Sequence, residues 1–181
     1  MRRVVVIGSS SGAGKTTFAR ALAARLALPH IELDALHWQQ TGWELPEREV
    51  FRERVDRATS AEAWVLDGNY SATRDIVWPR ADTVVWLDVP LRVALPRIVG
   101  RTLRRIRGRE VLWGTNRETL RNAFLDRDSL ILFTIRTYRG RRGRFLRELT
   151  RPENAHLVVH RFASNAAADR WLAQLPPSGD A

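Results

Sequence analysis

The feature that most constrains this chain is a glycine-rich loop between an apolar run and a helical pattern. Residues 3–7 (RVVVI) form a continuous run rich in β-branched side chains, which is typical of a parallel strand buried on both faces. Residues 8–14 (GSSSGAG) follow, and from Lys15 the apolar residues repeat at helical spacing up to Leu26, before Pro29. The order is therefore strand, glycine loop, helix.

The loop carries the second half of the phosphate-binding pattern G-x-x-x-x-G-K-[ST], in Gly14, Lys15 and Thr16. The first glycine of that pattern falls on Ser9, so the loop either accepts serine there or is one residue longer, starting at Gly8. Glycines let successive backbone N–H groups point into one concavity, and the following helix adds its positive end. The pattern predicts a cradle for the phosphates of ATP, and an ordinary glycine-rich turn is the alternative. The expected cradle residues are Gly8, Ser9, Ser10, Ser11, Gly12, Ala13, Gly14, Lys15, Thr16 and Thr17.

Lys15 is the only lysine in a chain that contains 29 arginines. An ammonium group is a compact point charge on a slim stem, whereas a guanidinium is planar and wider, so lysine fits a backbone cradle where arginine does not. We therefore predict that Lys15 reaches the β- and γ-phosphates and that the Thr16 hydroxyl is a ligand of Mg²⁺.

Length and composition favour one soluble domain. The 181 residues are 44% hydrophobic, enough for one core, and contain no cysteine, which excludes a disulfide framework and a thiolate metal site. No apolar run approaches the roughly 20 residues of a membrane span, so we expect no membrane association and a cytoplasmic location. The predicted division is a single domain over residues 1–175 and a flexible tail over residues 176–181.

The net charge of +10 is concentrated in one third of the chain. Residues 1–96 carry twelve basic and twelve acidic side chains, whereas residues 97–151 carry sixteen arginines and five acidic side chains. Such a block is typical of a chain that binds nucleic acid or phosphate groups, although a solvated helical surface gives the same composition. Its aromatic residues fall mostly at positions that helix cores use, and it contains no known nucleic-acid reader motif. Nucleic acid is therefore the less favoured partner.

The rest of the chain alternates between expected strands and expected helices. Further strands are expected at residues 30–33, 64–66, 83–88 and 156–160. Helices are expected after Pro46, after Pro90 with a late start or kink at Pro96, after the capping box Thr115–Glu118 and around Trp171. Residues 130–138 fit a helix or a strand, and the helix is preferred. This alternation predicts an α/β fold in which a parallel sheet has helices on both faces.

Three aspartates follow expected strands, namely Asp34, Asp67 and Asp88. Ligands of open parallel sheets bind beyond the carboxyl ends of the strands, so carboxylates at these ends are candidate site residues. Asp67 is the best candidate for the Mg²⁺ site, Asp34 for orienting an acceptor, and Asp88 for a structural role. Each of them equally fits a helix cap or a turn.

Several motifs resemble those of the adenylate kinase-like nucleoside monophosphate kinases of the P-loop superfamily, in particular a small bacterial branch labelled DNA topology modulation protein or adenylate kinase-related. The resemblance covers nearly the whole chain and rests on GSSSGAGKTT, LDALHW, LDGNY, ADTVVWLDVP and RIVGRTLRR. It implies a three-layer P-loop NTPase fold, with five parallel strands in the order 2-3-1-4-5 and an arginine-rich helical lid over residues 97–151. It also implies that Asp67 and Gly68 contribute to the Mg²⁺ site, that Arg97 lies against adenine and that Arg101 reaches phosphate.

Two departures from the family pattern concern the acceptor. His37 stands where adenylate kinases have the arginine that grips the phosphate of AMP, so the acceptor need not be AMP. The segment DGNYSATRD replaces the family's aspartate-glycine-phenylalanine-proline-arginine motif, which leaves Tyr70 or Arg74 to face the acceptor. In the alternative interpretation, His37 and Trp38 are packing residues.

Together these features predict an ATP-binding P-loop kinase that transfers the γ-phosphoryl group of Mg-ATP to a small acceptor, a nucleotide or nucleoside-like molecule. Arg97, Arg101 and Arg105 recur at helical spacing, so one helix face can fold Arg101 with Arg104 or Arg105 over the transferring group. The expected catalytic residues are Lys15, Arg101, Arg105 and Asp34. The alternatives are a nucleic-acid-associated regulator that uses residues 97–151 and an ATPase without an acceptor, and the pattern specifies no oligomeric state.

Overall fold

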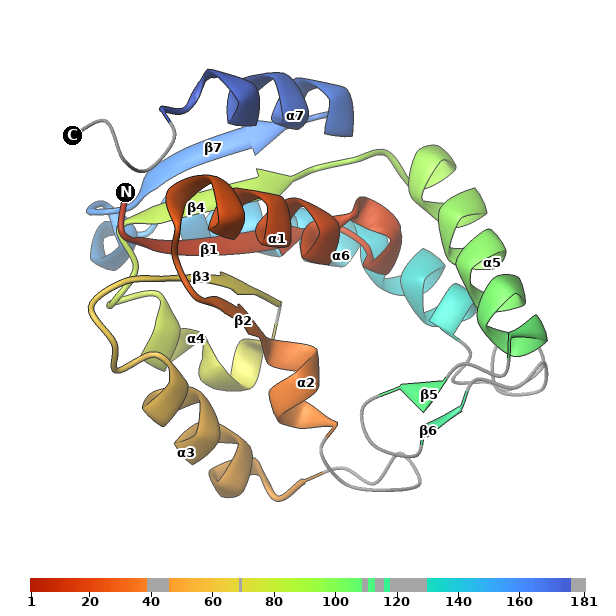
Figure 1. Ribbon diagram of the computed structural model, residues 1–181, viewed down its shortest axis with the longest axis horizontal. Coiled ribbons are helices and arrows are strands. Elements are labelled where there is room, and N and C mark those ends of the chain that lie inside the picture. Colours follow the sequence, from red (N-terminus) through yellow and green to blue (C-terminus); the bar gives the residue numbers. More distant parts are fainter. Residues whose placement is uncertain (39–45, 69, 109–110, 113–115, 118–129, 177–181) are drawn as a thin grey trace.

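The central sheet has five parallel strands in the predicted order. The computed structural model describes residues 1–38, 46–68, 70–108, 111–112, 116–117 and 130–176. The strands of the sheet are β1 (Arg3–Gly8), β2 (His30–Glu32), β3 (Trp64–Asp67), β4 (Thr83–Leu87) and β7 (Val158–Phe162). They are arranged β2-β3-β1-β4-β7 (Figure 1). Because β7 is the fifth of these strands along the chain, the expected order 2-3-1-4-5 is confirmed.

The two sides of β1 pack against different helices, which explains its uninterrupted apolar sequence. Val5 and Ile7 belong to a core cluster that includes side chains of α3 (Arg48–Ala58), α4 (Arg74–Val77) and α6 (Leu130–Leu149). Val4 and Val6 belong to a second cluster, with side chains of α1 (Lys15–Leu26) and α7 (Asn165–Gln174). Successive strand residues point to opposite faces, so both clusters require apolar residues in the same run. The result is a three-layer α/β/α architecture.

Each of the five strands differs by one or two residues from its expected bounds. The strand expected at 30–33 ends at Glu32, because Leu33 begins the short helix α2 (Leu33–His37). The strand expected at 156–160 begins and ends two residues later, at Val158–Phe162. The described residues also contain single turns of 3-10 helix at η1 (Ser11–Ala13), η3 (Ser71–Thr73) and η5 (Pro152–Asn154).

Helix α5 (Leu91–Arg107) corrects the expectation of a late start at Pro96. The helix begins at Leu91, and Pro96 lies inside it, although proline removes one backbone hydrogen bond and crowds the preceding turn. The buried side chains of α5 are Ala94, Ile98 and Thr102, which recur every four residues on one face. Tertiary packing of this face explains why the helix continues across the proline.

The segment between α5 and α6 contains a short antiparallel pair, β5 (Val111–Leu112) and β6 (Asn116–Arg117). The two ends of the expected capping box, Thr115 and Glu118, lie outside the described residues, as does the expected helix around Ala123 and the tail after Pro176. The segment 130–138 is helical, as expected, and forms the start of α6. Among the helices that the structure describes, none has the length and apolar character needed to cross a membrane.

Candidate active site

The glycine loop connects β1 to α1 at the carboxyl edge of the sheet, where η1 forms its turn (Figure 1). Gly14 adopts φ 87°, a left-handed conformation that favours glycine, and it stands directly before the first residue of α1. No described side chain caps this end of α1, so its first N–H groups are available to an anion. A Cβ on Gly8 would lie 3.0 Å from Cγ of Lys15, so glycine keeps room for the lysine stem. The loop therefore has the form of a phosphate cradle.

Ser9 takes the position of the first glycine in the phosphate-binding pattern without filling the cradle. Its side chain is fully buried, and its hydroxyl donates to Oδ1 of Asp88 at 2.7 Å. The same hydroxyl accepts a hydrogen bond from Nε1 of Trp86 at 3.0 Å. Trp86 belongs to β4 and Asp88 follows its last residue, so the serine side chain is directed to the end of this strand. The structure thus favours a loop that accepts serine over a longer loop that starts at Gly8.

Gly12 requires glycine because the loop lies directly against α5. A Cβ at this position would lie 2.3 Å from the carbonyl oxygen of Ala94 and 2.8 Å from Cγ1 of Ile98. We expect Gly12→Ala to lower the free energy of unfolding by about 1–3 kcal/mol, since neither helix backbone nor a buried isoleucine yields easily. Gly100→Ala on the same helix is the control, because no atom lies within 4 Å of its added Cβ. Urea unfolding measures both, and equal effects of the two substitutions would contradict this account of Gly12.

Four charged groups act on the ammonium of Lys15. Its Nζ donates to the carbonyl of Ser10 at 3.4 Å. Burial lowers the pKa of Lys15, the carboxylates of Asp34 and Asp67 raise it in part, and the guanidiniums of Arg141 and Arg101 lower it further. Charge–charge interactions weaken with distance, so these four side chains lie in the neighbourhood of Lys15. The structure brings together three of the predicted site residues with Lys15 and adds Arg141, from α6.

Two buried oxygen atoms at this site have no hydrogen-bond partner among the described residues, namely the Ser10 hydroxyl and Oδ1 of Asp67. The Asp67 side chain is 2% exposed, and its Oδ1 lies 3.5 Å from Nε2 of His30 on β2. A buried polar atom without a partner costs roughly 1–3 kcal/mol, which is a reason to look for a ligand there. A hydroxyl fits a phosphate oxygen, and a carboxylate fits a hydrated Mg²⁺ ion. The residues present therefore fit Mg-ATP.

Asp34 and Tyr70 form a hydrogen-bonded pair at the site. The Tyr70 hydroxyl donates to Oδ1 of Asp34 at 2.8 Å, which connects α2 to the segment after β3. Burial and the nearby Asp34 carboxylate raise the pKa of Tyr70 far above its usual value, so the phenol stays protonated. Burial also lowers the pKa of Arg141, while Asp34 and Tyr70 raise it in part. The hydrogen-bonded pair of Asp34 and Tyr70 therefore lies within electrostatic reach of the Arg141 guanidinium, and Asp34 and Arg141 both act on Lys15.

His37 lies in an aromatic cluster next to this pair. Its ring stacks on Tyr70 with centroids 4.6 Å apart and meets the edge of Phe51 at 4.7 Å and that of Trp38 at 4.6 Å. Burial lowers the pKa of His37, which favours the neutral imidazole near pH 7. The alternative interpretation of His37 as a packing residue fits these contacts. The same contacts hold Tyr70 in place against Asp34.

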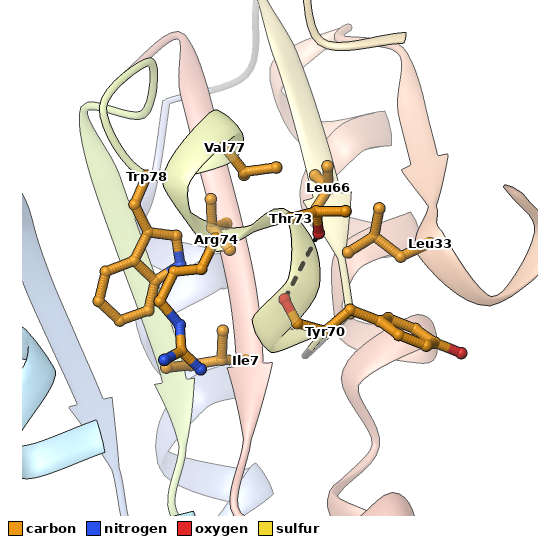
Figure 2. Close-up of a pocket in the computed structure, with 10 residues that line it drawn as sticks. Ile7, Leu33, Leu66, Tyr70, Thr73, Arg74, Val77 and Trp78 are labelled. Carbon is orange, nitrogen blue, oxygen red and sulfur yellow. Dashed lines mark hydrogen bonds between the residues drawn. The ribbon is translucent and has the colours of Figure 1, made fainter. Parts of the chain in front are cut away.

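Tyr70, rather than Arg74, faces the site. Figure 2 shows the phenol of Tyr70 and the guanidinium of Arg74 pointing in different directions from a cavity of about 10 Å³, room for one water. The Arg74 guanidinium carbon lies 5.0 Å from the ring centroid of Trp78 and 5.9 Å from that of Phe145. One of its nitrogens lies 3.9 Å from the Glu148 carboxylate. These contacts give Arg74 a packing role on the α6 side of the sheet.

The remaining predicted residues lie along α1 and α5. Thr16 is partly buried in the first turn of α1, and Thr17 is exposed beside it. Arg97 donates to Oδ1 of Asn165, whose Nδ2 in turn donates to the carbonyl of Ala13 at 2.8 Å. Arg97 is thus tied to the loop through α7. Arg105 stands one helical turn beyond Arg101, further from the part of α5 that touches Gly12.

Sequence reasoning missed Arg141, which lies beside Asp34 and Tyr70, and the contacts of Ser9. Residues 97–151 contain sixteen arginines, so no local pattern separates Arg141 from its neighbours. The Arg141 guanidinium also lies 4.8 Å from the ring centroid of Phe133, one more contact that only the folded helix reveals. For the contacts of Ser9 the sequence held one signal, namely the serine in place of the first glycine of the phosphate-binding pattern. Such a departure indicates a side chain that has hydrogen-bond partners of its own.

Comparisons with known proteins point to small-molecule kinases. The family model described as shikimate kinase matches residues 11–139. The chain is 32% identical over 133 residues to the uncharacterized protein YqaC of Bacillus subtilis strain 168, covering 72% of this chain and 73% of YqaC. It is 32% identical over 110 residues to the cytidylate kinase of Methanothermobacter thermautotrophicus, covering 52% of this chain and 66% of that enzyme. The solved shikimate kinase of Acinetobacter baumannii in complex with shikimate has a TM-score of 0.56 and 23% identity, over 96% of this chain and 90% of that chain. This last likeness concerns the fold alone.

Proposed function

The chain belongs to the shikimate kinase family, and on this premise we propose that it transfers the γ-phosphoryl group of ATP to a hydroxyl of a small acceptor that also carries an anionic group. The family match makes the chain an ATP-dependent kinase with a small-molecule acceptor, and the predicted membership of the P-loop nucleoside monophosphate kinase superfamily is confirmed. The observation that supports the finer proposal is the convergence of Asp34, Tyr70 and Arg141 beside Lys15.

The glycine loop binds the ATP phosphates in this proposal. The first N–H groups of α1, the Ser10 hydroxyl and the Lys15 ammonium supply donors without a bulky side chain in the cradle. Mg²⁺, when bound, neutralises charge on the phosphates, and Asp67 with the Thr16 hydroxyl would hold it. The described residues contain no group of three or more His, Cys, Asp or Glu able to hold a metal ion. Such an ion therefore relies on phosphate oxygens and water as well, as Mg²⁺ commonly does.

The acceptor hydroxyl is activated by Asp34. The oxygen of the acceptor hydroxyl forms a bond to the γ-phosphorus, and the bond from that phosphorus to the β,γ-bridging oxygen breaks. The hydroxyl proton passes to the Asp34 carboxylate. ADP and a phosphate monoester are the products. Lys15 and Arg101 stabilise negative charge on the transferring group, and Arg141 binds the anionic group of the acceptor. Arg105 and a closing segment over residues 97–151 remain predictions of the sequence.

A hydroxyl acceptor suits Asp34 better than a phosphate acceptor does. A carboxylate accepts hydrogen bonds and repels a phosphate oxygen at short range, whereas a hydroxyl donates its proton to it. The Tyr70 hydroxyl already donates to Oδ1, which leaves lone pairs of the carboxylate for a second hydroxyl. The cytidylate kinase relative supports a nucleoside monophosphate as the second candidate, and the flat stack of His37 on Tyr70 suits a base.

Phosphorus NMR with an acceptor panel tests this proposal. The protein is incubated with Mg-ATP and, separately, with shikimate, gluconate, cytidine monophosphate, adenosine monophosphate or no acceptor. We expect ADP together with a phosphate monoester signal for a hydroxylated acid. New diphosphate signals from a monophosphate would instead favour the second candidate. Release of inorganic phosphate alone in every sample would show an ATPase and contradict both.

A further inference from the structure

The carboxylate of Asp88 joins the glycine loop to two other elements. Asp88 is nearly completely buried at the end of β4, and its side chain is only 3% exposed. It accepts the 2.7 Å hydrogen bond from the Ser9 hydroxyl of the loop. It also accepts from Nε of Arg142 on α6, at 3.1 and 2.9 Å to its two oxygens, and from Nε of Arg161 on β7 at 3.0 Å. Three segments far apart in the chain therefore meet on one charged group.

Asp88 stays ionised in this environment. Burial raises its pKa, but hydrogen bonds from Arg161, Ser9 and Arg142 outweigh this and hold the pKa below its usual value. Hydrogen bonds to a charged group are stronger than neutral ones and more sensitive to position. The carboxylate is thus a firm anchor for each of its donors.

One face of α6 docks on the end of β4 through Asp88. The Tyr138 hydroxyl donates to the carbonyl of Val89 at 3.4 Å, Arg142 binds Asp88, and the Phe145 ring packs on Trp86 with centroids 5.7 Å apart. These three residues of α6 follow the spacing i, i+4 and i+7, so they share one face of the helix. Their contacts fix the position of α6 along its axis and its rotation about that axis, relative to the sheet.

Arg141 is the neighbour of Arg142 and points elsewhere. Consecutive residues of an α-helix are about 100° apart around its axis. While Arg142 binds Asp88, the charge of Arg141 acts on Lys15, Asp34 and Tyr70. The rotation of α6 set by Arg142 therefore decides where the Arg141 guanidinium stands.

We propose that Asp88 is a positioning residue that couples the phosphate loop, through Ser9, to the acceptor-binding Arg141, through Arg142. The inference rests on the proposed function, because that function assigns the loop of Ser9 to ATP and Arg141 to the acceptor. Its consequence is that a change in Arg142 alters nucleotide binding although Arg142 is outside the loop. Likewise, a change in Ser9 alters acceptor binding.

A double-mutant cycle tests this coupling. The variants are Ser9→Ala, Arg142→Ala and their combination, and the measurements are the Kd of Mg-ADP by calorimetry and the KM of the acceptor. We expect Arg142→Ala to raise the acceptor KM by about tenfold or more, the usual range for a lost charged hydrogen bond, and to weaken Mg-ADP binding severalfold. For each constant, the fold-change in the combined variant should be much smaller than the product of the two single fold-changes. Each single substitution already breaks the connection through Asp88.

Three further variants separate positioning from loss of charge or of stability. Arg139→Ala removes an exposed arginine from the same helix, and we expect it to leave both constants unchanged. Arg161→Ala removes a donor to Asp88 from β7, without touching α6, and should leave the acceptor KM within about twofold of wild type. Arg142→Lys, which restores the charge but not the two-oxygen contact, should recover part of the loss.

The possible outcomes have distinct meanings. Additive effects of Ser9→Ala and Arg142→Ala, in a wild type that binds Mg-ADP, would overturn the coupling and leave the proposed function intact. An increase in acceptor KM for Arg161→Ala equal to that for Arg142→Ala would also overturn it, because positioning through α6 would then be unnecessary. A wild type that binds no nucleotide would overturn the proposed function, and the inference with it.

Discussion

Lys15→Ala should reduce phosphoryl transfer by about a thousandfold or more, the scale of losing a charged donor that acts on the developing charge of a transition state. The protein should keep its stability, because the hydrogen bond that the ammonium donates to the Ser10 carbonyl is long, at 3.4 Å. Burial lowers the pKa of Lys15, so the charged side chain costs stability at neutral pH and its removal relieves that cost. The measurements are kcat with the best acceptor of the panel and the thermal unfolding midpoint.

Lys15→Arg is the matched variant, because it keeps the positive charge and changes only the shape of the group. We expect it to remain almost as inactive as Lys15→Ala, since a planar guanidinium is wider than an ammonium and cannot take its place in a backbone cradle. Full activity of Lys15→Arg would show that charge alone matters. Full activity of Lys15→Ala would contradict the assignment of the loop as the ATP cradle.

The sequence predicted the sheet well because β1 and its neighbours show the strongest apolar patterns. β1 and β4 are buried along nearly their whole length, so their apolar runs are uninterrupted. The edge strand β7 was misplaced by two residues, and its Val158 and Val159 are exposed, at 56% and 40%. Fewer side chains are buried on an exposed edge strand, so its sequence shows a weaker apolar pattern from which to predict the bounds. The expected late start at Pro96 was wrong, because α5 begins at Leu91 and its packing outweighs the local preference of proline.

The glycine loop was predictable from local spacing, whereas the sequence named Asp34 and Tyr70 on the acceptor side without indicating that they pair or that Arg141 lies near them. The cradle lies in one continuous segment, so its residues are recognisable together. Asp34 and Tyr70 are 36 positions apart and meet only because α2 and the segment after β3 fold over the same edge of the sheet. Arg141 and Arg142 are two of the sixteen arginines in residues 97–151, and their different roles depend on the rotation of α6. Part of the basic excess thus has specific partners within the chain, such as Asp88 for Arg142.

Asp34→Asn should lower kcat by about a hundredfold to ten-thousandfold, the usual contribution of a positioned general base. The amide keeps an oxygen that accepts the hydrogen bond from Tyr70, so the fold and the aromatic cluster of His37 should persist. The amide cannot take the acceptor proton, so the loss should fall on kcat while the KM of the acceptor changes little. Binding of Mg-ADP should be unimpaired, because Asp34 belongs to the acceptor side.

Tyr70→Phe is the control that separates proton transfer from positioning. It removes the 2.8 Å hydrogen bond to Asp34 and keeps the ring that stacks on His37. Because the carboxylate survives, we expect Tyr70→Phe to retain most of kcat and to raise the acceptor KM, as Asp34 loses its fixed orientation. A pH series sharpens the comparison, since a rate limited by proton transfer to a carboxylate falls at low pH in the wild type and in Tyr70→Phe but not in Asp34→Asn. If Asp34→Asn kept the kcat of the wild type, the carboxylate would be a structural partner of Tyr70 only, and the base would have to be sought in another group near Lys15.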